Sequence, residues 1–144
     1  MKKLLIDTNI VIDLLAKREP YYADSARLFS LADKKQVILT VSSLTIANTH
    51  YTLMKVKNAS ESKSILRKLK LILDVLPLDD KVIDLALNDS DFEDFEDGIQ
   101  YFSAIENNVD IIITRNLKDY KKSIKASVTS SVLSFPPRSA VTWS

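Results

Sequence analysis

Cysteine is absent from this chain of 144 residues, and glycine occurs once, at Gly98. Without cysteine there are no disulfides, no thiolate zinc sites and no cysteine nucleophile, which fits a reducing compartment. An average composition would supply about ten glycines. Loops of the G-x-G-x-x-G and Walker A types need glycine where the backbone approaches phosphate, so classical dinucleotide-binding and P-loop enzymes are excluded.

Long hydrophobic runs are also missing. Asp7 interrupts the opening Met-Lys-Lys-Leu-Leu-Ile before the roughly 7–15 apolar residues of a signal peptide. No later run approaches the ~18 residues of a membrane span. With a formal net charge of +1 and 46% hydrophobic residues, the composition is typical of soluble globular proteins. We expect a soluble, cytoplasmic protein with no membrane partner.

Short apolar runs alternate with helical patterns along the chain. This alternation predicts an α/β fold of three layers, with a central, mostly parallel sheet of four to five strands. The expected strands are 3–7, 36–41, 75–78 at a sheet edge, 110–114 and a weak last strand within 126–133. The expected helices are 10–17, 20–31, 43–57, 60–73, 80–87 and 95–107, with Asn9, Ser60, Asp79 or Asp80, and Asp94 as N-caps. One domain over 1–135 is expected, followed by a tail over 136–144 for which disorder is one interpretation.

Polar residues follow two of these strands where each one ends. Asp7 comes directly after Leu4-Leu5-Ile6, and Asn116 lies just beyond the strand at 110–114. Ligands of open α/β sheets bind at the carboxyl ends of the strands. Between the two strands, residues 89–97 carry six acids and no base. These features suggest a metal site.

Asp97 and Gln100 lie on one face of the expected last helix. If that face looks toward the strand ends, Asp97 meets Asp7. Two carboxylates ~4 Å apart repel by roughly 4 kcal/mol at an effective dielectric near 20, which a cation would relieve. Oxygen donors favour Mg²⁺ or Mn²⁺ over zinc. As an alternative, Asp94 and Asp97 serve only as an N-cap and a first-turn acid, and Asp7 only as a turn residue.

The chain resembles a PIN domain, the fold of many metal-dependent ribonucleases and of VapC-type toxins, over residues 3–135. The stretches that carry the resemblance are LLIDTNIVIDLL at 4–15, SSLTIANTHY at 42–51, EDGIQYFSAIENNVDIIITRN at 96–116 and KDY at 118–120. It implies an endoribonuclease that uses Mg²⁺ or Mn²⁺ to activate water against RNA phosphodiester bonds. Asp7 and Asp97 match the first and third family acids, Thr114 matches a ligand or a neighbour of one, and Asp119 matches a further acid.

Two positions depart from the family pattern. The second acid falls on Asn48 and the fourth on Asn116, so the site loses two negative charges. We expect weaker metal binding unless Asp94 or Asp119 compensates, because each charge beside a divalent ion contributes strongly to binding. Two functions therefore stay open: an active ribonuclease, or a PIN-like module that binds RNA or a protein without cleaving.

Basic residues follow the last predicted site position. Arg115, Lys118, Lys121 and Lys122 are candidates for RNA contacts. Arg115 could instead cap a helix or pair with an acid. The resemblance also implies a small antitoxin partner and a homodimer. Phosphatases of the haloacid dehalogenase type, which also begin with a strand ending in aspartate, need a second acid where this chain has Asn9.

Overall fold

The computed structural model describes residues 1–114 and 131–134. Strands and helices alternate as the sequence predicts. Within the described ranges, no helix has the length and hydropathy needed to cross a membrane. In chain order the elements are β1 (Lys3–Ile6), α1 (Thr8–Leu15), α2 (Tyr22–Asp33), β2 (Ile38–Ser42), α3 (Ser43–Leu53), α4 (Ala59–Leu69), β3 (Asp74–Leu76), α5 (Asp80–Asn88), α6 (Phe95–Glu106), β4 (Ile111–Thr114) and β5 (Ser131–Ser134).

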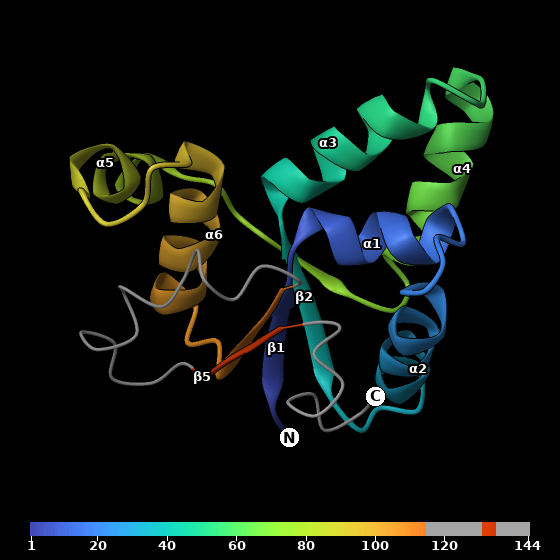
Figure 1. The fold of residues 1–144 in the computed structure, drawn as a ribbon, viewed down its shortest axis with the longest axis horizontal. Coiled ribbons are helices and arrows are strands. Elements are labelled where there is room, and N and C mark those ends of the chain that lie inside the picture. Colours follow the sequence, from blue (N-terminus) through green and yellow to red (C-terminus); the bar gives the residue numbers. More distant parts are fainter. Residues whose placement is uncertain (115–130, 135–144) are drawn as a thin grey trace.

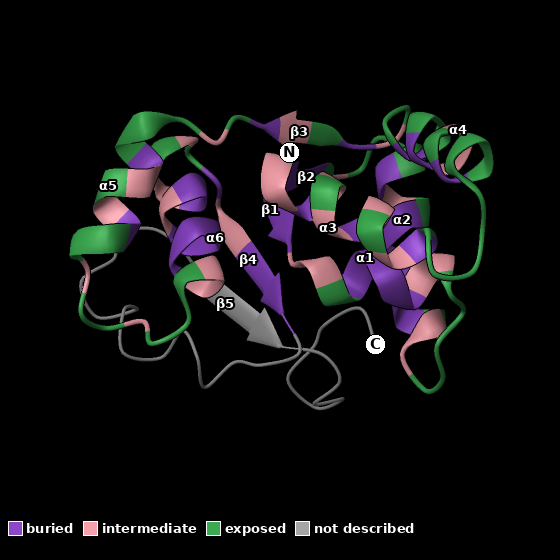
Figure 2. Cartoon of the chain, turned by 90° about the horizontal axis from the view of Figure 1, so that it is seen from above, coloured by how far each residue is buried: buried purple, intermediate pink, exposed green. Residues whose placement is uncertain are grey.

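The strands form one parallel sheet in the order β3-β2-β1-β4-β5. Helices α5 and α6 cover one face, and α1 to α4 lie on the other side (Figures 1 and 2). The predicted three-layer α/β/α fold with a mostly parallel sheet is therefore confirmed. The edge position predicted for 75–78 is also confirmed, since β3 ends the sheet and Pro77 follows it directly.

Strand β1 is buried on both faces, which explains its uninterrupted apolar run. Successive side chains of a strand point to opposite faces. Leu4 and Ile6 join the core beneath α1, α2 and α4, whereas Leu5 packs with Ile112 and the α6 residue Tyr101 in a second cluster. The central strand thus connects the two cores and holds its carboxyl end in a fixed place.

Two predicted N-caps are wrong by a few residues. Asp7, rather than Asn9, caps α1, and Asn58, rather than Ser60, caps α4. In both cases an earlier polar side chain accepts the hydrogen bond from the first turn, so the helix begins sooner. Of the two caps predicted for α5, Asp79 or Asp80, the structure has Asp79, and the prediction of Asp94 for α6 is confirmed. Strand β5 at Ser131–Ser134 overlaps the expected last strand, and the rest of the predicted range, before 131, lies outside the described residues.

Candidate metal centre

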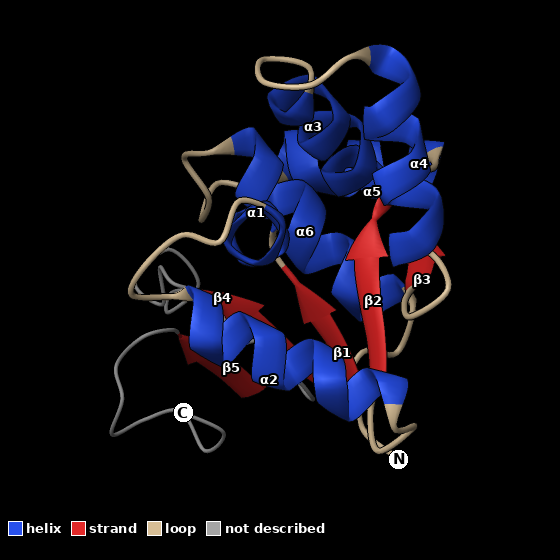
Figure 3. Ribbon diagram, turned by 90° about the vertical axis from the view of Figure 1, so that its right-hand side faces the viewer, coloured by secondary structure: helices blue, strands red, loops and turns tan. Residues whose placement is uncertain are grey.

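The carboxyl ends of β1 and β4 form the switch point of the sheet. From β1 the chain continues to β2 and β3 on one side, and it returns to β4 on the other side. In open α/β sheets this is the place where ligands bind. Figure 3 shows the strands running in one direction, with α1 and α3 following the ends of β1 and β2. A site at this edge can therefore draw residues from several helices.

Asp7 is held across the switch point. Its backbone N–H donates to the carbonyl of Ile113 at 3.2 Å. The buried Thr114 hydroxyl donates to Asp7 Oδ2 at 2.6 Å, and the Ile10 N–H donates to Oδ1 at 3.3 Å. Asp7 therefore caps α1 and also presents a half-buried carboxylate at the predicted place. The carboxylate thus lies at the positive end of the α1 dipole.

Asp97 lies in the first turn of α6 and is half-buried. The turn is shaped by the exposed Asp94, whose Oδ1 accepts from the N–H groups of Glu96 at 2.8 Å and Asp97 at 3.2 Å. The N-cap interpretation of Asp94 is thus confirmed, while its role as a metal ligand stays a prediction. The cap holds the two following acids at the start of the helix.

A polar network joins α6 to the ends of β1 and β2. Gln100 Nε2 donates to Thr45 Oγ1 at 3.0 Å, and that hydroxyl lies 3.0 Å from Thr8 Oγ1, next to Asp7. Ser42, at the end of β2, accepts from the Thr45 N–H at 3.2 Å. The α6 face that carries Gln100 therefore looks toward the strand ends, whereas the approach of Asp97 to Asp7 stays a prediction.

The sequence profile of the PIN domain matches residues 3–118. The chain belongs to the PIN domain family. Ribonuclease VapC1 of Aquifex aeolicus (strain VF5) is 24% identical to it over 132 residues, covering 89% of this chain and 91% of that protein. The predicted VapC-like identity is confirmed.

Solved VapC-type structures share the fold of this PIN domain. VapBC2 from Rickettsia felis, bound to a DNA fragment from their promoter, matches with a TM-score of 0.65 and 20% identity, over 90% of this chain and 97% of that chain. Mycobacterium tuberculosis VapC20, a toxin that cleaves the sarcin-ricin loop, matches with a TM-score of 0.58 and 14% identity, over 76% of this chain and 86% of that chain. At these identities the likeness establishes the fold.

Asn48, which the resemblance predicts to match the second family acid, lies on α3. Its Nδ2 donates to Glu96 Oε1 at 2.9 Å, which links α3 to the first turn of α6. Glu96 was not among the predicted site residues, and Gln100 was predicted only to share a helix face with Asp97. The spacing of Glu96 to Gln100, one helical turn, is the signal that could have pointed to both.

Oxygen donors dominate this edge of the PIN domain. Within residues 1–114 and 131–134, no three Asp, Glu, His or Cys side chains lie close enough together to hold an ion by themselves. Mg²⁺ commonly uses one or two carboxylates and keeps several waters, so a pair of acids with hydroxyl and amide oxygens fits it. Gln100 Oε1 is buried and has no hydrogen-bond partner among the described residues, which leaves an acceptor for a water or ion ligand.

Several predicted site residues lie outside the described residues. Their roles as ligands or RNA contacts stay predictions. The residues concerned are Arg115, Asn116, Lys118, Asp119, Lys121 and Lys122.

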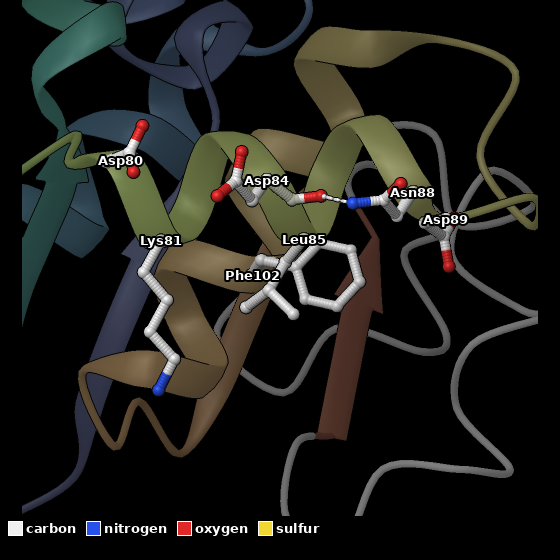
Figure 4. Close-up of a pocket in the computed structure, with 7 residues that line it drawn as sticks. All are labelled: Asp80, Lys81, Asp84, Leu85, Asn88, Asp89 and Phe102. Carbon is white, nitrogen blue, oxygen red and sulfur yellow. Dashed lines mark hydrogen bonds between the residues drawn. The ribbon is translucent and has the colours of Figure 1, made fainter.

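Figure 4 shows a hollow that lies elsewhere in this PIN domain. It follows α5, between Asp80 and Asp89, and Phe102 of α6 borders it. None of its lining residues belongs to the predicted metal site. The candidate site stays at the carboxyl ends of the strands, where polar side chains from three helices meet, namely Thr8, Thr45 and Gln100.

Proposed function

We propose that this chain is a Mg²⁺- or Mn²⁺-dependent endoribonuclease that hydrolyses RNA phosphodiester bonds. The observation that carries the proposal is the Asp7 carboxylate at the switch point, held by Thr114 and joined to the acidic start of α6 through Thr8, Thr45 and Gln100. The likeness to Ribonuclease VapC1 and to the VapC20 toxin supports RNA as the substrate class.

The predicted site residues have different parts in this proposal. A divalent ion supplies an activated water and neutralises charge on the phosphate. Asp7 and Asp97 would hold the ion, and the Thr114 hydroxyl would orient Asp7 by donating to Oδ2. Asn48 would offer its amide oxygen, while Asn116, Asp119 and Asp94 are further proposed ligands. No side-chain nucleophile is required, since water attacks the phosphorus.

We also propose partners for the domain at 1–135. A small antitoxin protein is expected, because the related solved structures include a toxin–antitoxin complex from Klebsiella pneumoniae. A second copy of the chain is expected from the family resemblance. The function would then be that of the toxin in a type II toxin–antitoxin pair. A neighbouring gene for a small DNA-binding protein would support it. Arg115, Lys118, Lys121 and Lys122 are proposed to contact the RNA backbone, which would make binding weaken with salt.

A second candidate function is a module that binds RNA or protein without cleaving. Asn48 favours it, because an amide at this position brings no charge and its Nδ2 is engaged with Glu96. In that case RNA binding would be the same with and without divalent metal.

The deciding experiment is cleavage of a structured RNA by the purified full chain with Mg²⁺, Mn²⁺ or EDTA. We expect metal-dependent cleavage, which Asp7→Asn and Asp97→Asn each reduce on the order of a hundredfold or more. Asparagine is as good an N-cap as aspartate, so Asp7→Asn should still fold. Asp80→Asn, in the exposed first turn of α5, is the matched control and should cleave like the wild type.

Three other outcomes would change the conclusion. Cleavage that survives both substitutions would indicate a contaminating nuclease. Cleavage that persists in EDTA would contradict the metal-dependent mechanism. A folded wild-type protein that binds RNA and does not cut it with either metal would establish the binding module in place of the nuclease.

A further inference from the structure

The contact between Asn48 and Glu96 joins two positions far apart in the chain. Asn48 lies on α3, Glu96 lies in the first turn of α6, and both are half-buried. The 2.9 Å bond runs from the amide Nδ2 to the carboxylate Oε1. A carboxylate is thus held next to the residue where the family pattern would itself supply one. The negative charge that α3 lacks is present one side chain away.

This hydrogen bond leaves one oxygen of each side chain, Asn48 Oδ1 and the second carboxylate oxygen of Glu96, able to bind a water or a cation. An amide that donates through Nδ2 keeps its Oδ1 on the opposite edge, where it can accept from a water or ligate a cation. The carboxylate of Glu96 has a second oxygen with the same capacity. Because Asn48 donates to Glu96 Oε1, the Glu96 carboxylate is tied to α3.

A second, independent feature points to a ligand at the same place. Gln100 is 2% exposed, and its Oε1 has no hydrogen-bond partner in the described part of the chain. It lies one turn after Glu96 on α6, so the two side chains share a face. Buried carbonyl oxygens are nearly always paired, with ordered water where protein donors are lacking. An acceptor in this position suits water carried by a hydrated cation.

We propose that Glu96 replaces the acid missing at position 48 and holds the metal ion through its bound water, positioned by Asn48. The proposal rests on the proposed metal-dependent function. A role through water fits the geometry, since no three acids or histidines cluster within the described residues. It also fits Mg²⁺, which retains several waters when protein binds it. Glu96 is therefore a positioning residue whose effect is on metal affinity.

The test is Mn²⁺ binding to the full chain without RNA, measured by calorimetry and by the electron paramagnetic resonance signal of unbound Mn²⁺. We expect Glu96→Gln to weaken binding about 10–100-fold, the usual effect of losing a group that supports a metal site from outside its ligand shell. Glu93→Gln is the matched control, because Glu93 is an exposed acid three residues earlier. It should bind Mn²⁺ like the wild type.

An exchange of the two side chains gives a sharper test. The double variant Asn48→Glu/Glu96→Gln keeps an amide and a carboxylate in contact and moves the charge back to α3. We expect its Mn²⁺ affinity to return to near the wild-type value. Circular dichroism and thermal unfolding of each variant establish that the proteins compared are folded.

The outcomes separate this inference from the proposed function. If Asp7→Asn abolishes Mn²⁺ binding while Glu96→Gln does not change it, the role of Glu96 is overturned and the metal-dependent function stands. If the folded wild type does not bind Mn²⁺, both fail. If Glu96→Gln weakens Mn²⁺ binding and the double variant Asn48→Glu/Glu96→Gln does not restore it, the inference that Glu96 replaces the acid missing at position 48 is overturned.

Discussion

Two helices of this PIN domain begin in the same way and differ in what surrounds their first turns. Asp79 caps α5 by accepting from the Val82 N–H at 3.0 Å, and Asp80 follows in the first turn. Asp94 caps α6, with Glu96 and Asp97 in its first turn. By sequence both are acidic helix starts in which aspartate satisfies unpaired backbone N–H groups and the helix dipole favours negative charge.

Their surroundings give the two starts different chemistry. The acids of the α5 start are exposed, and in Figure 4 Asp80 and Asp84 point away from Lys81. The cation there pairs instead with Glu106, at 2.6 Å. At the start of α6 the cap Asp94 is exposed, whereas Glu96 and Asp97 of the first turn are half-buried, and Asn48 of α3 contacts Glu96. An acidic first turn therefore becomes a candidate metal site when neighbouring elements partly bury its carboxylates and place further polar side chains beside them.

The largest effects on stability and metal binding are expected when the N-cap side chains of α5 and α6 are removed. Asp79→Ala and Asp94→Ala should each lower the free energy of unfolding by about 1 kcal/mol, because the backbone N–H groups of the first turn lose their acceptor. Only Asp94→Ala should also weaken Mn²⁺ binding, since that turn carries Glu96 and Asp97. Urea unfolding and Mn²⁺ titration measure the two effects, with Asp79→Asn and Asp94→Asn as controls that retain the cap. Equal loss of Mn²⁺ binding in both alanine variants would contradict the distinction.

A side chain added at Gly98 tests the contact between the two helices, because α6 packs on α5 at this residue. A Cβ there would lie 3.5 Å from Ala86 Cβ and 3.7 Å from Phe92 Cβ, which are ordinary contacts. The helix contact therefore has room for a Cβ at this position and does not require glycine. Gly98→Ala should stabilise the protein by about 0.5–1 kcal/mol through helix propensity. Urea unfolding measures the gain. Gly98→Leu should destabilise it by overpacking the helix contact, and a gain there would contradict this account.

The smallest effect is expected at Lys81, the cation of α5. The hydrogen bond to Glu106 and the charge of Glu106 raise the pKa of Lys81 above its ordinary value. A raised lysine pKa means that the stabilisation is present at pH values below the unfolded pKa and is lost as pH rises through the folded pKa. Lys81→Gln should therefore be slightly less stable than the wild type at neutral pH, and the difference should vanish above the folded pKa.

Urea unfolding across pH measures this difference, with Lys63→Gln on the exposed face of α4 as the control. Surface ion pairs are weak and screened by salt, so the effect should also shrink at high ionic strength. A stability difference that persists at high pH would assign the effect of Lys81 to packing of its side chain instead.

Much of the architecture could be predicted from residue patterns. Buried parallel strands read as continuous apolar runs, so β1 and β4 were identifiable, and with them the positions of Asp7 and Thr114. The N-caps of α1 and α4 were misplaced because polar residues crowd both starts. Propensity does not decide which of several adjacent oxygens reaches the first-turn N–H groups.

The candidate site was predictable only in part. Asp97 and Gln100 were placed on one helix face by their spacing, but only the structure shows that Gln100 on that face contacts Thr45. Glu96 was missed, because six acids in 89–97 offered several candidates and the pattern did not rank them. Its selection depends on which side chain of α3 stands opposite, and that residue is 48 positions earlier in the chain.

Residue order alone specified the alternation of strands and helices, the carboxylate at the end of the first strand, and candidate metal ligands that are oxygen donors, with no cysteine in the chain. These properties follow from local periodicity and composition. Only the tertiary structure decided that Asn48 meets Glu96 and that Gln100 reaches Thr45 beside Thr8. Periodicity assigns a residue to a face of its own helix, whereas the rotation and position of that helix against its neighbours are set by packing of the whole core.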